Sequence, residues 1–130
     1  MKVVRRGAGL SPAIALTLLA TGCATDRPTT PLEMTCGDLA VIGRVETVRE
    51  QPEPPPADWQ SRYDVQIHIR KVVRGTESRT VVPASAIAHA HLRDDIDFLM
   101  VLTPEPGGGF SIKSAQINSL KPGLKSRCEG

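Results

Sequence analysis

Aromatic side chains are scarce in this chain of 130 residues, and so are clusters of basic residues. The only aromatic residues are Trp59, Tyr63, Phe98 and Phe110. Proteins that bind single-stranded nucleic acid stack the bases on aromatic side chains, and nucleic-acid binders in general carry a basic patch that neutralises phosphates. Beyond the N-terminal segment the chain offers only a loose basic group, which consists of Arg70, Lys71, Arg74 and Arg79. We therefore expect no nucleic-acid partner.

The chain also lacks the motifs that carry catalysis or bind phosphate or calcium. Ser85, Ser111 and Ser114 lie in no nucleophile motif, and no base can be paired with them. The glycines of 107–109 are not followed by the Lys-Ser/Thr pair and helix of a phosphate-binding loop. The acidic run 93–97 lacks the glycine turn of a calcium loop. We expect a hairpin turn at the glycines, a solvated turn at the acidic run, and no enzymatic activity.

No apolar run is long enough for a comfortable membrane span, which needs about 20 residues. The charge-free stretch Gly7–Ala20 comes nearest, and it follows the basic residues Lys2, Arg5 and Arg6. A positive start, a short apolar core and small residues at the end are the layout of a secretory signal, so residues 1–22 are expected to be a cleaved signal peptide. Without its three basic residues the exported chain has 13 basic and 14 acidic residues, a formal charge of about −1.

The signal ends in Ala20-Thr21-Gly22-Cys23, which resembles the lipobox of bacterial lipoproteins. In that family the cysteine thiol is alkylated with diacylglycerol and the chain is cut just before it, so the resemblance implies lipid on Cys23. The leucine usual three residues before the cysteine is Ala20 here. The alternative is ordinary cleavage after Ala24 and a soluble product. Ala24, rather than aspartate, after the cysteine implies an outer-membrane protein that faces the periplasm.

Two segments without apolar periodicity contain the prolines of the exported N-terminal half. Residues 23–35 include Pro28 and Pro31, which predicts a surface tether. Residues 51–58 include four prolines and cannot form a helix interior or a central strand, because proline lacks the backbone donor that both need. Strand patterns flank this second segment, so we expect a loop within one domain of residues 36–130.

With Cys23 assigned to lipid, Cys36 and Cys128 remain at the two ends of the predicted domain. In an oxidising compartment such a pair is expected to form a disulfide. Closing a loop of about 90 residues stabilises the fold by about 4–5 kcal/mol if the effect is chain entropy. Free thiols or a metal–thiolate role are the alternatives.

The remaining sequence alternates as half-buried strands do. The expected strands are Asp38–Val48, Tyr63–Val73, Thr80–Pro83, Ile96–Thr103 and one that begins at Phe110. The residues expected to face inward on the second strand are Tyr63, Val65, Ile67 and Ile69. Gly43 marks a bulge or a bend in the first strand. Five such strands predict a mostly β, small OB-like barrel. Ala84–Arg93 breaks the pattern and is expected to form a short helix or an irregular link.

The order of these features resembles the netrin-like module of tissue inhibitors of metalloproteinases, an OB-fold barrel. The shared features are Cys36, the strand 38–48, a variable loop, the strand that ends near Gly75, and the apolar strand 97–102. The resemblance implies the fold. Those inhibitors chelate the protease zinc through the amine and carbonyl of an N-terminal cysteine. Cys36 lies 13 residues inside the predicted exported chain, so we do not expect the inhibitory mechanism.

The three histidines, His68, His89 and His91, are candidate metal ligands. A His-x-His pair on one strand aims both imidazoles to one side, and three neutral ring nitrogens suit zinc. The alternative places His68 on an outer strand face and the other two at polar positions in a link. These histidines make a metal-binding protein or a metal-dependent enzyme one of two functions that the sequence suggests. The other function, described next, requires no metal or cofactor.

The function that the sequence favours is a non-catalytic binding module at the cell envelope. We expect activity on exposed loops, of which Gln51–Gln60 is the longest. Its prolines stiffen it, and it holds Trp59, the single tryptophan. Tryptophan is enriched among interface hot spots, so Trp59 is the candidate contact with an envelope protein partner. The alternative is that Trp59 folds over the open end of the barrel as a plug.

Overall fold

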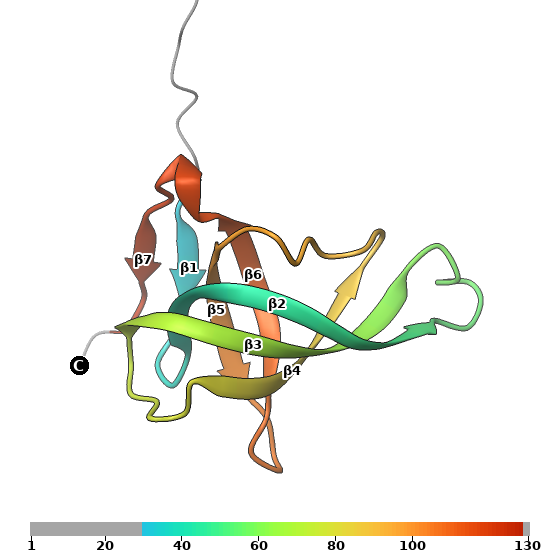
Figure 1. Cartoon of the computed structure of the whole chain (residues 1–130), viewed down its shortest axis with the longest axis horizontal. Coiled ribbons are helices and arrows are strands. Elements are labelled where there is room, and N and C mark those ends of the chain that lie inside the picture. The colour runs from blue at the N-terminus through green and yellow to red at the C-terminus, as the bar shows by residue number, and fades with distance from the viewer. Residues whose placement is uncertain (1–29, 129–130) are drawn as a thin grey trace, which may run out of the picture.

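The computed structural model describes residues 30–128 (Figure 1). The predicted signal peptide, the predicted lipidation site Cys23 and most of the predicted tether lie outside the described residues. Within residues 30–128, no helix is long and apolar enough to cross a membrane.

Strands make up most of the described chain. In chain order the elements are β1 (Leu32–Met34), β2 (Leu39–Pro52), β3 (Ser61–Arg74), β4 (Val81–Ala88), β5 (Phe98–Pro104), β6 (Phe110–Ile117), the 3-10 turn η1 (Asn118–Leu120) and β7 (Leu124–Ser126). Five strands close a barrel in the order β2-β3-β4-β6-β5, in which only the β4–β6 pair is parallel. β1 and β7 form a separate parallel pair, which we call the ribbon. The predicted mostly β, OB-like barrel of five strands is confirmed.

The barrel interior is filled by alternate residues of each strand. Along β3, Tyr63, Val65 and Ile67 are buried and Ile69 is partly buried, as the strict alternation predicts. Burial of a side chain of this size stabilises by about 1.5–3 kcal/mol. The other buried residues of the interior cluster come from the other four barrel strands. These residues are Leu39, Val41, Val45, Val82, Ala84, Met100, Leu102 and Phe110.

Gly43 bends β2, as its position predicts. The pairing of β2 with β5 ends at Gly43, and its register with β3 shifts between Ile42 and Gly43. A Cβ atom at position 43 would collide with the backbone carbonyl of His68, so only glycine fits this close approach. Before Gly43, β2 pairs with strands on both sides. Beyond it, β2 leaves β5 and pairs only with β3, which pairs with β4 on its other side (Figure 1).

The ribbon explains why β2 and β5 carry apolar residues on both faces. Leu32 and Met34 of β1 are buried against Ala40, Leu99 and Val101, which face outward from the barrel. This second cluster is separate from the interior cluster. The last residues of the predicted tether, 32–34, therefore belong to the fold. Three alternating residues beside prolines and threonines give too short a pattern to show a strand in the sequence.

β4 differs from the prediction because it continues through Pro83 to Ala88. The Ile69 amide donates to the Thr80 carbonyl at 2.7 Å, so these two residues form a hydrogen-bonded pair of β3 and β4. Hydrogen-bonded and non-hydrogen-bonded pairs alternate along antiparallel strands, so Gln66 and Pro83 form a non-hydrogen-bonded pair. In that alternation the nitrogen of Pro83 points away from β3, and pairing with β6 begins only at Ala84. The missing donor thus leaves no partner unpaired. The expected strand end at Pro83 is wrong. Residues 84–93 are expected from the sequence to form a short helix or an irregular link. Residues 84–88 continue the strand instead, and the irregular link begins only after Ala88.

Candidate binding site at the distal end of the barrel

Two connections lie together at one end of the barrel, which we call the distal end. They are the β2–β3 loop, residues 53–60, and the β4–β5 link, residues 89–97. They are neighbours because Ser61, at the start of β3, pairs with Ala88, at the end of β4 (Figure 1).

The β2–β3 loop is closed by its own backbone hydrogen bonds. The amide of Glu53 donates to the carbonyl of Gln60 at 3.1 Å, and the amide of Ala57 donates to the carbonyl of Pro54 at 3.0 Å. Three prolines, Pro54 to Pro56, also restrict the backbone of this loop, and Pro52 ends β2 just before it. The loop thus holds Trp59 on a constrained backbone, as the proline content predicts.

Trp59 lies outside the barrel and is 61% exposed. Its ring stacks on the imidazole of His89 with centroids 4.5 Å apart and planes 17° apart. The expectation that Trp59 plugs the barrel is therefore wrong, because a plug would be buried among the interior side chains. Ile87, two residues before His89, is 54% exposed on the outer face of β4. We call Trp59, His89 and Ile87 together the Trp59 patch.

A second aromatic contact fixes the link to the barrel. The Tyr63 hydroxyl donates to Oε1 of Glu50 at 3.3 Å, and the His91 ring meets the Tyr63 ring edge-on with centroids 5.6 Å apart. Nε2 of His91 lies 3.4 Å from Oε2 of Glu50. Burial first, and then the Glu50 carboxylate, raise the pKa of Tyr63 above its usual value. The phenol is thus neutral at pH 7 and donates to Glu50.

The far end of the link is held by charge. Asp97 accepts from Nε of Arg44 at 3.2 Å and lies 3.0 Å from a guanidinium nitrogen of Arg70. Arg93 binds Asp95 within the link at 2.7 Å, and this hydrogen bond lowers the pKa of Asp95. Asp94 and Asp95 are exposed, which agrees with the predicted solvated turn. The link is therefore fastened at both ends while its middle crosses the barrel.

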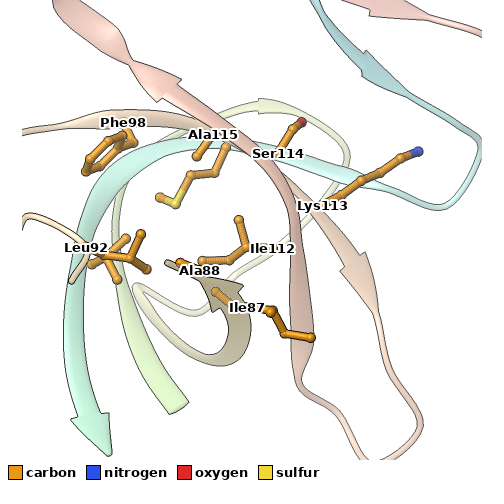
Figure 2. Close-up of a pocket in the computed structure, with 11 residues that line it drawn as sticks. Ile87, Ala88, Leu92, Phe98, Ile112, Lys113, Ser114 and Ala115 are labelled. Carbon is orange, nitrogen blue, oxygen red and sulfur yellow. The ribbon is translucent and has the colours of Figure 1, made fainter. Parts of the chain in front are cut away.

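An apolar pocket of about 190 Å³ lies beneath the link (Figure 2). It forms because β4 and β6 pair only at Ala84–Phe110 and Ser85–Ser111 and then separate. The side chains around it are mainly apolar and include Val45, Ala88, Leu92, Phe98, Met100 and Ile112. Figure 2 shows the amine of Lys113 and the hydroxyl of Ser114 pointing away from this space. An apolar cavity of about 150 Å³ is large enough to bind benzene, so this pocket has room for one ring-sized apolar group.

The structure does not bring the three histidines together. His68 lies on the outer face of β3, where Nε2 is 2.7 Å from Oε2 of Glu46. Ser61, at the distal end, lies seven positions before His68 on β3, which is about 23 Å at about 3.3 Å per residue. His89 and His91 make the aromatic contacts described above. Among residues 30–128, no group of three or more His, Cys, Asp or Glu side chains is placed to hold a metal ion. The hypothesis of a three-histidine site is therefore wrong.

A buried carboxylate, which no pattern in the sequence indicates, lies at the opposite end of β2. Asp38 is 8% exposed and accepts from the Thr35 amide at 2.8 Å, from Oγ1 of Thr103 at 3.0 Å and from Nζ of Lys113 at 3.2 Å. Burial alone raises the pKa of Asp38, but these bonds outweigh it and hold the pKa below its usual value. The network joins the start of β2 to β5 and β6. Thr103 and Lys113 are 65 and 75 residues away in sequence, so no local motif marks the site.

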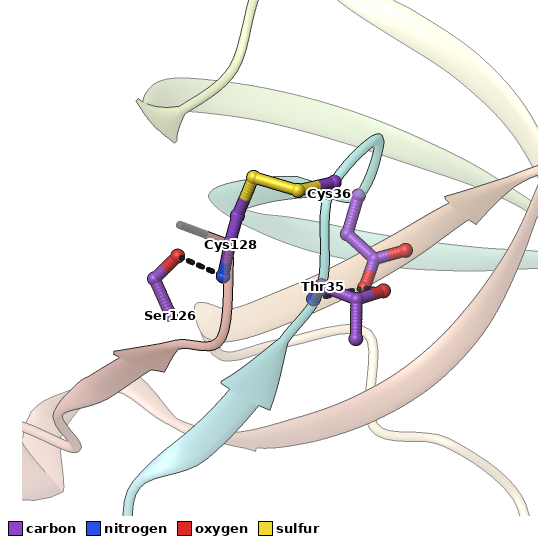
Figure 3. The surroundings of a disulfide bond; sticks show 5 residues. Thr35, Cys36, Ser126 and Cys128 are labelled. Carbon is purple, nitrogen blue, oxygen red and sulfur yellow. Dashed lines mark hydrogen bonds between the residues drawn. A yellow bond between two sulfur atoms is a disulfide. The ribbon is translucent and has the colours of Figure 1, made fainter. Parts of the chain in front are cut away.

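The predicted disulfide is confirmed. Cys36 and Cys128 are bonded, with Cα atoms 4.8 Å apart, just beyond the ends of β1 and β7 (Figure 3). Both cysteines are exposed. The amide of Cys128 donates to the Ser126 hydroxyl at 3.2 Å. The bond therefore closes one end of the ribbon.

Comparison of the chain with family models, with curated proteins and with solved structures finds no match.

Proposed function

We propose that the chain is a lipid-anchored protein of the cell envelope, attached through Cys23 to the outer membrane, and that its barrel is a non-catalytic binding module. The distal end of the barrel contacts a protein partner. The exposed Trp59, stacked on His89 at the end of a constrained loop, is the observation that carries this proposal.

The Trp59 patch has the properties of a contact surface. Tryptophan gives a large apolar area with few rotatable bonds and is enriched among interface hot spots. The stack on His89 and the hydrogen bonds of the loop restrict Trp59 before any partner arrives. Less conformational entropy is then lost on binding, which favours affinity.

The apolar pocket adjoins the Trp59 patch, because Ile87 also lines it. Leu92 lines the pocket from the same link that carries His89. A partner that covers the Trp59 patch would place an apolar side chain of leucine or phenylalanine size next to the pocket. Such an anchor side chain in a desolvated pocket is typical of interface hot spots.

The test is affinity capture from envelope extracts with the exported chain and with its Trp59→Ala variant. Leu120→Ala is the matched control, because Leu120 is also an exposed large apolar residue but lies in η1, which Figure 1 shows far from the β2–β3 loop that carries Trp59. The proposal expects a partner that is retained by the wild type and by Leu120→Ala and lost from Trp59→Ala. Equal retention by all three chains would reject the distal end as the contact.

A further inference from the structure

The ribbon acts as a cover on the outside of the barrel. Leu32 and Met34 of β1 and the partly buried Leu124 of β7 pack on the outward-facing residues Leu99 and Val101. These residues form a cluster of their own, apart from the interior cluster. Removal of the ribbon would therefore expose an apolar face without opening the barrel interior.

Few interactions other than the disulfide hold β7. The amide of Leu32 donates to the carbonyl of Gly123 at 2.9 Å, and the amide of Arg127 donates to the carbonyl of Met34 at 2.9 Å. The ion pair between Arg127 and Glu33, 2.8 Å, is exposed, and pairs of this kind contribute little to stability. Of the three β7 residues, only Leu124 is partly buried.

The barrel does not need the ribbon to keep its own end closed. Asp38 lies two residues after Cys36 and ties the start of β2 to Thr103 and Lys113. The interior cluster and the strand pairing of the barrel involve no residue of β1 or β7. Opening of the ribbon is therefore expected as a local event rather than as global unfolding.

We propose that Cys36–Cys128 is a site of thiol–disulfide exchange, and that its reduction by a dithiol releases β7 while the barrel stays folded. Both cysteines are exposed, so an attacking thiolate reaches the bond, and exposed disulfides are the more readily reduced ones. The disulfide is the strongest tie of the ribbon. Without it, the remaining contacts of β7 are a short strand pair, the exposed ion pair of Arg127 with Glu33, and one apolar side chain.

The exchange proceeds in two steps. A thiolate of the dithiol attacks one sulfur, which forms a mixed disulfide and releases the other cysteine as a thiolate that takes up a proton. The second thiol of the reductant loses its proton and attacks the mixed disulfide, so the reductant leaves as a disulfide. Two electrons pass from the dithiol to the protein, and Cys36 and Cys128 end as thiols. A disulfide oxidant reverses both steps.

Hydrogen exchange on the exported chain, before and after dithiothreitol treatment without denaturant, tests this proposal. Alkylation and mass spectrometry verify that Cys36 and Cys128 become thiols. The amides of Leu32 and Arg127 report on the ribbon, and the Ile69 amide, which donates to Thr80, reports on the barrel. Reduction should speed exchange of the ribbon amides by about tenfold or more, while Ile69 stays protected because the barrel remains folded.

Two variants separate the disulfide from the neighbouring contacts. The double variant Cys36→Ser with Cys128→Ser should show the exchange of the reduced chain without any dithiol. Arg127→Ala, which removes the exposed ion pair but keeps the disulfide, should keep the Leu32 amide as slow as in the oxidised wild type. The proposal is overturned if the bond resists dithiothreitol under native conditions, if verified reduction leaves the ribbon amides protected, or if Ile69 loses protection together with them.

Discussion

Trp59 and His89 stack with their ring centroids 4.5 Å apart, although one lies in the β2–β3 loop and the other in the β4–β5 link. The contact joins two connections that have no strand pairing of their own. It keeps Trp59 in one orientation while leaving the residue 61% exposed. A constrained, exposed tryptophan is the reason to place the binding surface at the distal end of the barrel.

The lipid anchor is tested by Cys23→Ser. The lipobox resemblance implies that the thiol of Cys23 carries the diacylglycerol and that cleavage follows this modification. The variant should remain an uncleaved precursor and take up no labelled fatty acid. Gel mobility and radiolabelling measure both properties, and normal labelling of the variant would reject the anchor. Cys128→Ser, which removes a cysteine outside the predicted lipobox, should be processed and labelled as the wild type is.

The Asp38 network should make stability depend on pH in the acidic range. The folded-state pKa of Asp38 is lowered, so its contribution is present above the unfolded pKa, near 3.8, and is lost as the pH falls through the lower folded value. Asp38→Asn should reduce the free energy of unfolding by about 1–3 kcal/mol at pH 7, because charge-assisted bonds are lost. The difference from the wild type should shrink below pH 4. Urea unfolding at a series of pH values measures it, and a constant difference would contradict this role.

Gly43→Ala should strongly destabilise the barrel. The added Cβ would meet the backbone carbonyl of His68, and backbone atoms between paired strands cannot move aside freely. We expect a loss of about 1–3 kcal/mol or more in the free energy of unfolding, the usual cost of overpacking. Gly123→Ala is the matched control, since its new Cβ would lie 4.0 Å from the nearest atom, the Cβ of Pro31. Equal effects of the two substitutions in denaturant unfolding would count against the close approach at Gly43.

Filling the apolar pocket should block a small apolar ligand. Toluene is the probe, because a pocket of about 190 Å³ has room for one ring. In NMR titrations, we expect saturable shifts of the methyl groups of Leu92 and Ile112 in the wild type and none in Ala88→Leu. The variant should keep the wild-type pattern of shifts elsewhere, which shows that it folds. Equal toluene shifts in both chains would place the binding outside the pocket.

The barrel was predictable because its signals are local. Strand alternation has a period of two residues, so Tyr63, Val65 and Ile67 identify the inner face of β3 directly. Gly43 is also a local signal, because a single glycine within an apolar strand marks a bulge or a bend. The course of β4 was not predictable, because the sequence shows that Pro83 lacks a donor but not that its nitrogen faces a side with no strand partner.

The sites were predictable only where the residue type or the local composition carries the signal. The two cysteines bracket the domain, so their pairing followed from the export that the N-terminal segment predicts, and a proline-rich loop is exposed in most folds. Asp38 gave no signal, because its partners come from β5 and β6 and meet it only after the barrel closes. The spacing of His89 and His91 suggested ligands, but the ring contacts to Trp59 and Tyr63 depend on the pairing of β3 with β4.

The most direct test of the binding surface measures stability and partner capture together on Trp59→Ala. Because Trp59 is exposed, its removal should change the free energy of unfolding by no more than about 1.5 kcal/mol, the value of one stacked aromatic pair. The same variant should lose the envelope partner that the wild type and Leu120→Ala retain. A loss of stability of about 3–5 kcal/mol, as for a buried tryptophan, or undiminished capture of the partner by Trp59→Ala, would contradict a binding surface at Trp59.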